Sequence, residues 1–321
     1  MTAGPPHAGR VVTIGESLGI FMGDAASPLR VGSLARFSFA GAEGNVAIGL
    51  ARLGHAVSFV SRVGGDDIGR MVVESMRGEG VDVEHVVVDK SAPTALMIRQ
   101  HRTGDVLTVA YYRAGAAGSR LSRPDLPEDL VRSASVLHLT GITAAVSDTA
   151  RRTMARALEV AHEAGALVSL DVNHRATLWS AQSAGEALRP MLQHVDLVFG
   201  GDDELCLLAS GTDVDESAAT ILRGHPSTVV RKRGAEGATA YGQFGRIDVP
   251  ALAVTPVDPV GAGDAFVAGY LSALLDGEDV PGRLARGVEC GAFVVSVRGD
   301  WEGFPRRAEL GMLARSEQVH R

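Results

Sequence analysis

Short runs of apolar residues alternate along the chain with longer stretches whose apolar positions follow the helical period. The short runs lie at residues 11–15, 57–64, 135–141, 166–173, 195–201 and 227–234, and they have the length and β-branched content of buried strands. The longer stretches lie at 44–54, 68–80, 149–165 and 215–224, and each ends on a glycine of the kind that caps helices. This alternation predicts an α/β fold with a mainly parallel sheet covered by helices on both faces.

Two segments, residues 17–39 and 94–118, interrupt the alternation. They contain the β-like pieces FSFA, ALMIRQ and VLTVAYYR without a helix between them. We expect a small antiparallel sheet that forms a lid over a site at the strand ends. No linker rich in Pro, Gly or Ser divides the chain, so residues 11–314 are predicted to be one domain. Residues 1–10 are expected to be a disordered leader, a terminal helix should begin at Arg306, and residues 315–321 should form a tail.

Composition narrows the classes of function. The net charge is −7 and no basic block stands apart from acidic neighbours, which argues against a nucleic-acid surface. No apolar run is long enough for a transmembrane helix, and the first ten residues lack the apolar core of a signal peptide. Cys206 and Cys290 stand alone, as expected of reduced thiols. We therefore expect a cytoplasmic protein without a membrane partner.

Lys90 and Lys232 are the only lysines among 31 basic residues. A composition bias of the source genome is the simplest explanation of this excess of arginine. The bias nevertheless matters, because a phosphate site built on several lysines is excluded. The chain also lacks the GxxxxGK[ST] phosphate-binding sequence.

The segment VDPVGAGDAF, residues 257–266, supplies another way to bind phosphate. Gly261 and Gly263 allow a tight turn, and the apolar stretch VAGYLSALL predicts a helix directly after it. The N–H groups and the dipole of that helix would point at an anion held in the turn. Asp264 in the first helical turn could accept a proton from an attacking hydroxyl group, or it could simply cap the helix.

The GAGDAF turn, together with the upstream segments AGAEGNVAIGLARLG and RVGGDDIGR, resembles the two signature regions of the ribokinase-like (PfkB) carbohydrate kinases. The similarity extends from Val11 to about Leu310. It implies a three-layer α/β/α fold with a small β-sheet lid, and in-line phosphoryl transfer from ATP and Mg²⁺. By this resemblance Asp264 is the catalytic base, and Gly261, Ala262 and Gly263 form the anion hole.

The same resemblance implies binding residues. Gly41 and Asn45 would contact the sugar, although Asn45 could instead cap the nearby helix, and Ala40 replaces a glycine that is usual in the family. Lys232, Gly234 and Gly237 would lie against the nucleotide, but a plain hairpin turn would look much the same.

The expected metal site departs from the family pattern. Many relatives carry an Asn-x-x-Glu sequence that organises magnesium through water, and this chain has Gly201-Asp202-Asp203-Glu204. Glu204 remains the candidate for holding metal-bound water, with Asp202 or Asp203 compensating for Gly201. Acidic residues that open a helix also favour its dipole without any metal. The resemblance further allows a monovalent cation near Asp258 and Val260.

Three segments, residues 111–115, 171–179 and 298–303, resemble the branch of the family that phosphorylates 2-keto-3-deoxygluconate. Arg113 and Arg175 can each present a guanidinium group to a sugar carboxylate. Tyr111 would cover the sugar, and Ile142 completes the substrate-binding set. In a chain so rich in arginine, each of these residues could instead serve packing or a surface salt bridge.

Other functions remain open at this point. Met97 stands where related kinases often have an aromatic residue, so the substrate could be another sugar acid or a neutral sugar, as in a fructokinase or ribokinase. Gly201 favours a catalytically weak sensor of sugar or nucleotide, whereas the intact GAGD turn argues against it. A nucleoside kinase would explain Arg113 and Arg175 poorly. Exposed lid strands favour a homo-oligomer, a dimer or larger.

Overall fold

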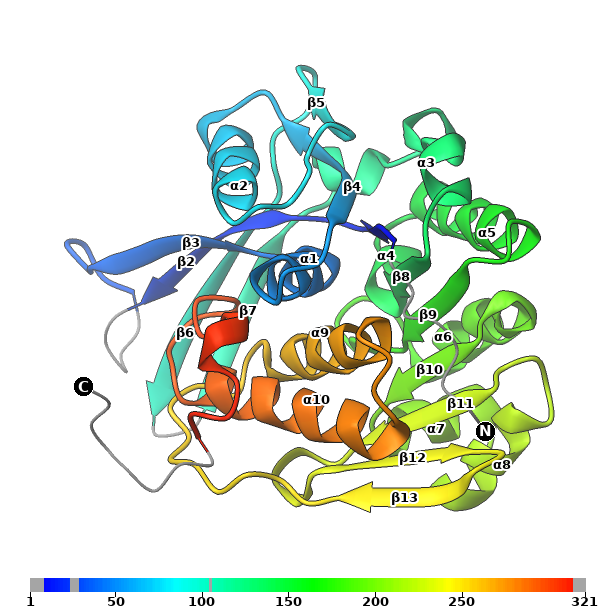
Figure 1. The fold of residues 1–321 in the computed structure, drawn as a ribbon. Coiled ribbons are helices and arrows are strands. Elements are labelled where there is room, and N and C mark those ends of the chain that lie inside the picture. Colours follow the sequence, from blue (N-terminus) through cyan, green and yellow to red (C-terminus); the bar gives the residue numbers. More distant parts are fainter. Residues whose placement is uncertain (1–8, 24–28, 104–105, 314–321) are drawn as a thin grey trace.

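A computed structural model of the chain describes residues 9–23, 29–103 and 106–313. Its centre is a nine-stranded sheet in the order β13-β12-β11-β10-β9-β8-β1-β4-β5 (Figure 1). The last two strands in the sequence form an antiparallel hairpin at one edge, and the other seven are parallel. The nine strands are β1 (Val11–Ile14), β4 (Val57–Gly64), β5 (Val86–Asp89), β8 (Val136–Thr140), β9 (Leu167–Asp171), β10 (Leu197–Gly200), β11 (Thr228–Lys232), β12 (Ala238–Gly242) and β13 (Gly245–Val249).

Helices cover both faces of this sheet, as the sequence predicts. Side chains alternate between the faces along each strand, so Val11 belongs to one hydrophobic core and Val12 to the other. The first core includes residues of α1 (Ala42–Arg52), α2 (Asp67–Gly78), α9 (Ala262–Leu275) and α10 (Val280–Val295). The second includes residues of α3 (Glu128–Arg132), α4 (Gly141–Val146), α5 (Asp148–Glu163), α6 (Ala181–Leu188), α7 (Asp202–Ala209) and α8 (Val214–Leu222).

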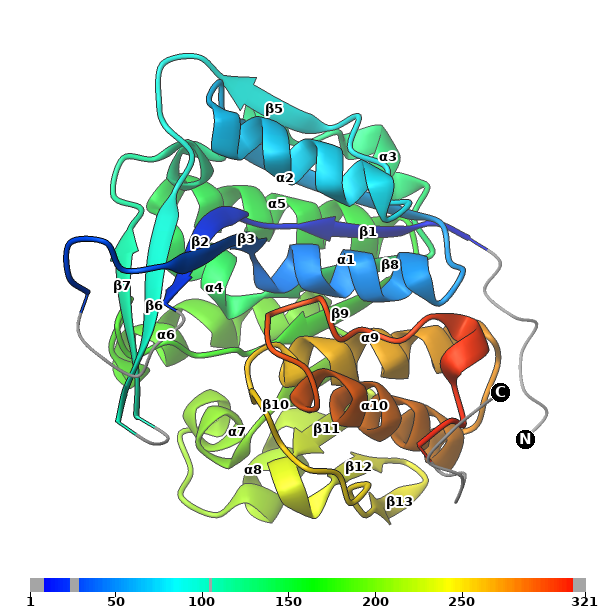
Figure 2. The same cartoon turned by 90° about the vertical axis from the view of Figure 1, so that its left-hand side faces the viewer.

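A separate four-stranded sheet contains β3 (Ala35–Ala40), β2 (Leu18–Gly23), β6 (Leu96–Thr103) and β7 (Val106–Tyr112), in that order. It lies beyond the end of β1, as Figure 2 shows. The expectation of a purely antiparallel sheet is wrong, because β2 and β6 pair in parallel. Both strands enter the small sheet after a parallel strand of the large sheet, so they run in the same direction.

Further details differ from the sequence analysis. Up to residue 313, where the description ends, the terminal helix predicted from Arg306 is only a short 3₁₀ turn at Arg307–Glu309. The strands β5, β12 and β13 were not predicted. β5 and β13 lie at the two sheet edges with partly exposed side chains, and β12 is a short run made mostly of small residues.

The ends of the chain leave other expectations untested. The leader, apart from residues 9 and 10, and the tail lie outside the described residues, so the domain boundaries at residues 11 and 314 stay a prediction. Within the described residues, no helix is both long and apolar enough to cross a membrane.

Candidate active site

A cavity of about 680 Å³ lies between the small sheet and the carboxyl ends of the parallel strands. This is the edge at which ligands bind in open α/β sheets. Most of the predicted site residues line it, although they are dispersed over more than two hundred positions of the sequence. They are Gly41, Asn45, Tyr111, Arg113, Ile142, Arg175, Glu204, Lys232, Gly261, Gly263 and Asp264. Ala262, Gly234 and Gly237 are not among its lining residues.

The glycine-rich turn opens directly into α9. Gly261 is the residue before this helix and has φ +80°, a conformation that favours glycine. A Cβ atom on Gly261 would lie 1.9 Å from the carbonyl oxygen of Asp300, so the turn leaves no room for a side chain. The first N–H groups of a helix have no partner within that helix, and here they begin at the cavity. The arrangement can therefore hold an anion.

Asp264 is almost fully buried in the first turn of α9. Asn45 Nδ2 donates to its Oδ2 over 2.8 Å, and Asn173 Nδ2 lies 3.4 Å from its Oδ1. Burial raises the pKa of the Asp264 carboxyl from 3.8 to about 6, although the hydrogen bond from Asn45 and the charges of Arg175 and Lys232 lower it. A carboxylate with this pKa is suited to accept a proton near neutral pH.

Asn45 does not cap the helix in which it lies. The N-cap of α1 is Gly41, and Asn45 is inside the helix with its side chain directed at Asp264. The second polar atom of this side chain, Asn45 Oδ1, is buried and has no hydrogen-bond partner among the described residues. It can therefore accept a hydrogen bond from a hydroxyl group of a ligand in the cavity.

Gly41 is fixed by its close packing. A Cβ atom on this residue would lie 2.3 Å from the carbonyl oxygen of Glu16, so the backbone leaves no room for a side chain. The neighbouring Ala40 is buried at the end of β3 and lines the cavity. Its methyl group therefore occupies space that the family's usual glycine would leave open.

Lys232 brings a positive charge to the anion site. Its Nζ lies 2.6 Å from Asp171 Oδ2 and 2.8 Å from Asp171 Oδ1. The same Nζ would be 3.6 Å from a Cβ atom on Gly263. Burial opposes the charged form, but Asp171, Glu204 and Asp264 outweigh it and the pKa of Lys232 is raised. The amine therefore remains an ammonium group beside the turn.

The two candidate arginines differ in their surroundings. Arg113 Nη2 lies 3.1 Å from Glu16 Oε2, and its guanidinium stacks on the ring of Tyr111 at 4.5 Å. Glu16 therefore compensates much of its charge. Arg175 is exposed at the rim of the cavity, where its Nη1 donates to the carbonyl oxygen of His174 over 3.2 Å. Of the two, Arg175 has more charge available for an acidic ligand.

Glu204 is held by backbone groups on two sides. Its Oε2 accepts from Gly201 N over 2.8 Å, and its Oε1 accepts from His174 N over 2.7 Å. Each carboxylate oxygen can accept more than one hydrogen bond, so Glu204 can still bind the water of a hydrated cation. Within the described residues, no group of three acidic, His or Cys side chains is arranged to hold a metal directly. A magnesium ion here would rely on water and the nucleotide phosphates.

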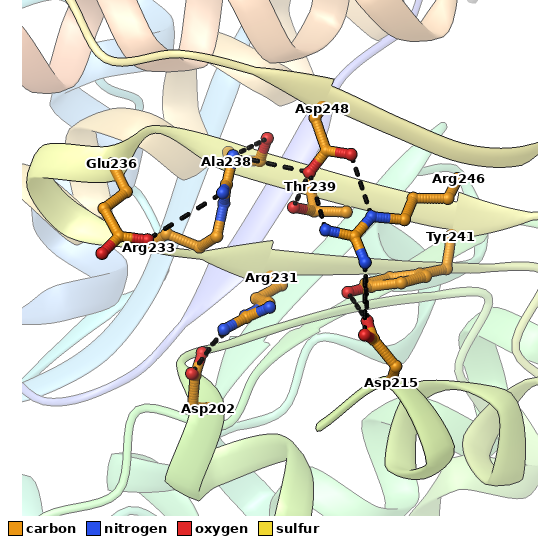
Figure 3. Close-up of polar contacts among 10 residues, drawn as sticks. All are labelled: Asp202, Asp215, Arg231, Arg233, Glu236, Ala238, Thr239, Tyr241, Arg246 and Asp248. Carbon is orange, nitrogen blue, oxygen red and sulfur yellow. Dashed lines mark hydrogen bonds and ion pairs between the residues drawn. The ribbon is translucent and has the colours of Figure 1, made fainter. Parts of the chain in front are cut away.

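Asp202, proposed from the sequence to compensate for Gly201, is engaged in an ion pair with Arg231. Figure 3 shows Arg231 on β11 directed at Asp202 at the start of α7. The two guanidinium–carboxylate distances are 2.6 Å and 2.5 Å. The pair forms because the parallel register places Arg231 opposite Gly200, next to the start of α7. It anchors the helix that carries Glu204.

Gly234 and Gly237 lie in the turn between β11 and β12. Gly237 is buried, and a Cβ atom there would be 2.0 Å from the carbonyl oxygen of Val249. This contact explains why a glycine is needed without any nucleotide. Gly234 is exposed and has nothing near its Cβ position, so a ligand could approach it.

Some cavity residues were not chosen from the sequence. Glu16, Arg99, Asn173 and Asp300 all line the cavity. Glu16 could have been suspected, because it follows the buried strand β1 at the carboxyl edge of the sheet. Arg99 carried no such signal, since its partners are distant in the sequence.

Comparisons with known proteins place these features in a family. Residues 10–307 match the model of the pfkB family carbohydrate kinases. A 2-dehydro-3-deoxygluconokinase of Thermoproteus tenax is 37% identical over 95% of this chain and 94% of its own length. Fructokinase-2 of Solanum lycopersicum is 32% identical over 95% of this chain and 96% of its own length.

Solved structures of carbohydrate kinases have the same fold as this chain. A PfkB protein from Polaromonas sp. JS666 has a TM-score of 0.84 and 37% identity, covering 94% of this chain and 99% of its own. A fructokinase from Xylella fastidiosa with bound ATP has a TM-score of 0.83 and 25% identity, covering 95% of this chain and 97% of its own. The chain therefore belongs to the pfkB family of carbohydrate kinases.

Proposed function

We propose that this ATP-dependent sugar kinase phosphorylates the terminal hydroxyl group of a keto-deoxy sugar acid, converting 2-keto-3-deoxygluconate to its 6-phosphate. The observation that carries the proposal is the charge around the cavity. Arg175 and Asp264 line the same space, so one group can bind a carboxylate while the other receives a proton. The similarity to a 2-dehydro-3-deoxygluconokinase supports this choice of substrate.

In the proposed reaction the sugar hydroxyl loses its proton to Asp264 as its oxygen attacks the γ-phosphorus of ATP. The bond from that phosphorus to the β,γ-bridging oxygen breaks, and ADP leaves with the bond's electron pair. Asn45 holds the carboxylate in place through its 2.8 Å hydrogen bond. The N–H groups around Gly261 and Gly263 receive the transferred phosphoryl group, and Lys232 adds a positive charge beside them. Magnesium bound with the nucleotide would neutralise phosphate charge, and Glu204 would hold its water. The oligomeric state and the cellular location stay predictions.

The direct test is a coupled assay of ADP release with 2-keto-3-deoxygluconate, its galactonate epimer, gluconate, fructose and ribose. We expect strong turnover with the keto-deoxy acids alone. Preference for fructose or ribose would contradict the choice of substrate and leave the kinase assignment intact. No turnover with any sugar would instead support a sensor.

Replacing Arg175 by Met should lower kcat/KM for the acidic substrate much more than for a neutral sugar. A lost charge-assisted hydrogen bond lowers kcat/KM by about 10-fold to 100-fold for the keto-deoxy acid. The residual activity with fructose should change little, because fructose has no carboxylate. Steady-state kinetics with both sugars would measure this difference. Equal losses with both would mean that Arg175 acts through Asp264 or the fold.

The matched comparison is Arg113→Met. Its removal leaves the buried Glu16 without a cation, so we expect a lower melting temperature as well as a higher KM. Arg175→Met, at an exposed position, should keep the wild-type melting temperature. Thermal unfolding of both variants therefore separates binding from folding.

The pKa of Asp264 predicts a pH profile. With a pKa of about 6, the carboxyl is mostly protonated below pH 6 and cannot act as a base. We expect kcat/KM to rise with pH through about 6 and to level off above about 7. Kinetics across this range would measure it. A profile that is flat between pH 5 and 7 would contradict the proposed role, since the base form would then be fully present throughout.

A fructokinase is the second candidate. Arg113 is compensated by Glu16, which leaves fewer free charges for a carboxylate than the sequence suggested. Met97 stands in the wall of the cavity opposite Tyr111 on the neighbouring strand. The similarity to fructokinases supports this alternative, and the sugar panel separates it from the first.

A further inference from the structure

Arg99 is a buried cation of the small sheet. It lies on β6 and is 4% exposed. Its Nη1 is 2.7 Å from Asp300 Oδ1, and its Nη2 is 3.1 Å from Asp258 Oδ2. Both carboxylates are buried as well. A pair of buried carboxylates needs a compensating cation, and Arg99 supplies it.

The two carboxylates belong to the segments that shape the anion turn. Asp258 Oδ1 accepts from Val260 N over 3.2 Å, within the turn itself. The carbonyl oxygen of Asp300 is the atom against which Gly261 packs. Arg99 therefore joins the small sheet to both walls of the turn in front of α9.

These contacts occupy the place near Asp258 and Val260 where the family resemblance allows a monovalent cation. One Asp258 oxygen is engaged by Arg99 and the other by Val260 N. Arg298 lines the same small cavity beside Asp258 and adds a further positive charge. A free cation would have to displace a guanidinium group that already makes two ion pairs, so the residues present do not fit it.

We propose that Arg99 takes the place of a monovalent cation in this kinase and is a positioning residue for the anion turn. Its guanidinium group fixes Asp258 and Asp300, which in turn fix Gly261 and the N–H groups around it. Since Arg99 comes from the small sheet, the turn is completed only when β6 is seated against it. The proposal does not depend on which sugar is the substrate.

The first arm of the test uses the wild-type enzyme. Turnover of the best sugar in the panel is compared in potassium and tetramethylammonium chloride at one ionic strength. We expect the same kcat in both salts. Calorimetric titration with the nonhydrolysable Mg²⁺ complex of an ATP analogue, in the same two salts, gives a readout even if no sugar in the panel is turned over. Several-fold activation or tighter nucleotide binding in potassium would overturn the proposal.

The second arm uses Arg99→Met. Misplacement of the turn should lower kcat by about 100-fold. Added guanidinium ion or potassium should restore part of this loss, and Arg99→Lys should retain more activity than Arg99→Met. Arg70→Met, an exposed arginine on α2, is the matched control and should behave as wild type. If Arg99→Met keeps the wild-type kcat, Arg99 has no positioning role. If neither guanidinium ion nor potassium restores any of the activity that Arg99→Met loses, the role of Arg99 is structural only.

Discussion

Asp264→Asn is expected to lower kcat by about 1,000-fold while leaving the melting temperature unchanged or higher. The amide has nearly the same shape as the carboxylate and can still contact Asn45, but it cannot accept the proton of the sugar hydroxyl. Single-turnover kinetics with MgATP and the sugar would measure the loss directly. The KM for the sugar should change much less, because the proton transfer occurs in the chemical step.

The expected gain in stability follows from the pKa of Asp264. Burial raises this pKa from 3.8 to about 6, so between about pH 4 and 6 the folded carboxyl keeps a proton that the unfolded one has lost. The folded state therefore loses stability as the pH rises through that interval, and the loss persists at neutral pH. An asparagine avoids this cost, which amounts to at most about 3 kcal/mol.

Asp67→Asn is the matched control for this variant. Asp67 also lies in the first turn of a helix, α2, but its side chain is 90% exposed. Its substitution should change neither kcat nor the melting temperature by much. If Asp264→Asn retained turnover within tenfold of the wild type, another group would have to be the base. If it lost stability instead, the carboxylate would be a structural group.

The anion turn could be predicted from the sequence because its chemistry is local. Gly261, Gly263 and Asp264 are within four positions of one another, and the apolar stretch directly after them predicts the helix that begins at this turn. Most of the parallel strands were likewise predictable, since their continuous apolar runs identify them. The partly exposed edge strands β5 and β13 lack that signal and were missed, as was β12, whose buried run is short and made mostly of small residues.

The polar contacts between distant segments could not be predicted in this way. Asn45 and Asp264 are 219 positions apart, and Arg99 and Asp300 are 201 positions apart. Such pairs depend on how the small sheet and the helices dock, which local patterns do not determine. The same reason explains two ion pairs that the sequence did not indicate: Arg113 is paired with Glu16, and Asp202 is held by Arg231.

Gly261→Ala should abolish most activity and destabilise the fold, and the comparison with Gly277→Ala should show why. Both glycines have nearly the same backbone conformation, with φ +80° and +81°. A Cβ atom on Gly277 meets nothing within 4 Å, whereas on Gly261 it would lie 1.9 Å from the carbonyl oxygen of Asp300. The shared strain of a left-handed alanine should cost each variant about 1–2 kcal/mol of unfolding free energy.

The difference between the two variants then isolates the close packing of the turn. Gly261→Ala must move either the turn or the Asp300 segment, and either movement shifts the N–H groups that would hold the phosphoryl group. We expect kcat to fall by about 100-fold or more for Gly261→Ala, and to remain near the wild-type value for Gly277→Ala. Denaturant unfolding and steady-state kinetics on both proteins would measure the two effects. Equal losses of activity in the two variants would mean that general destabilisation, and not the geometry of the anion turn, limits the reaction.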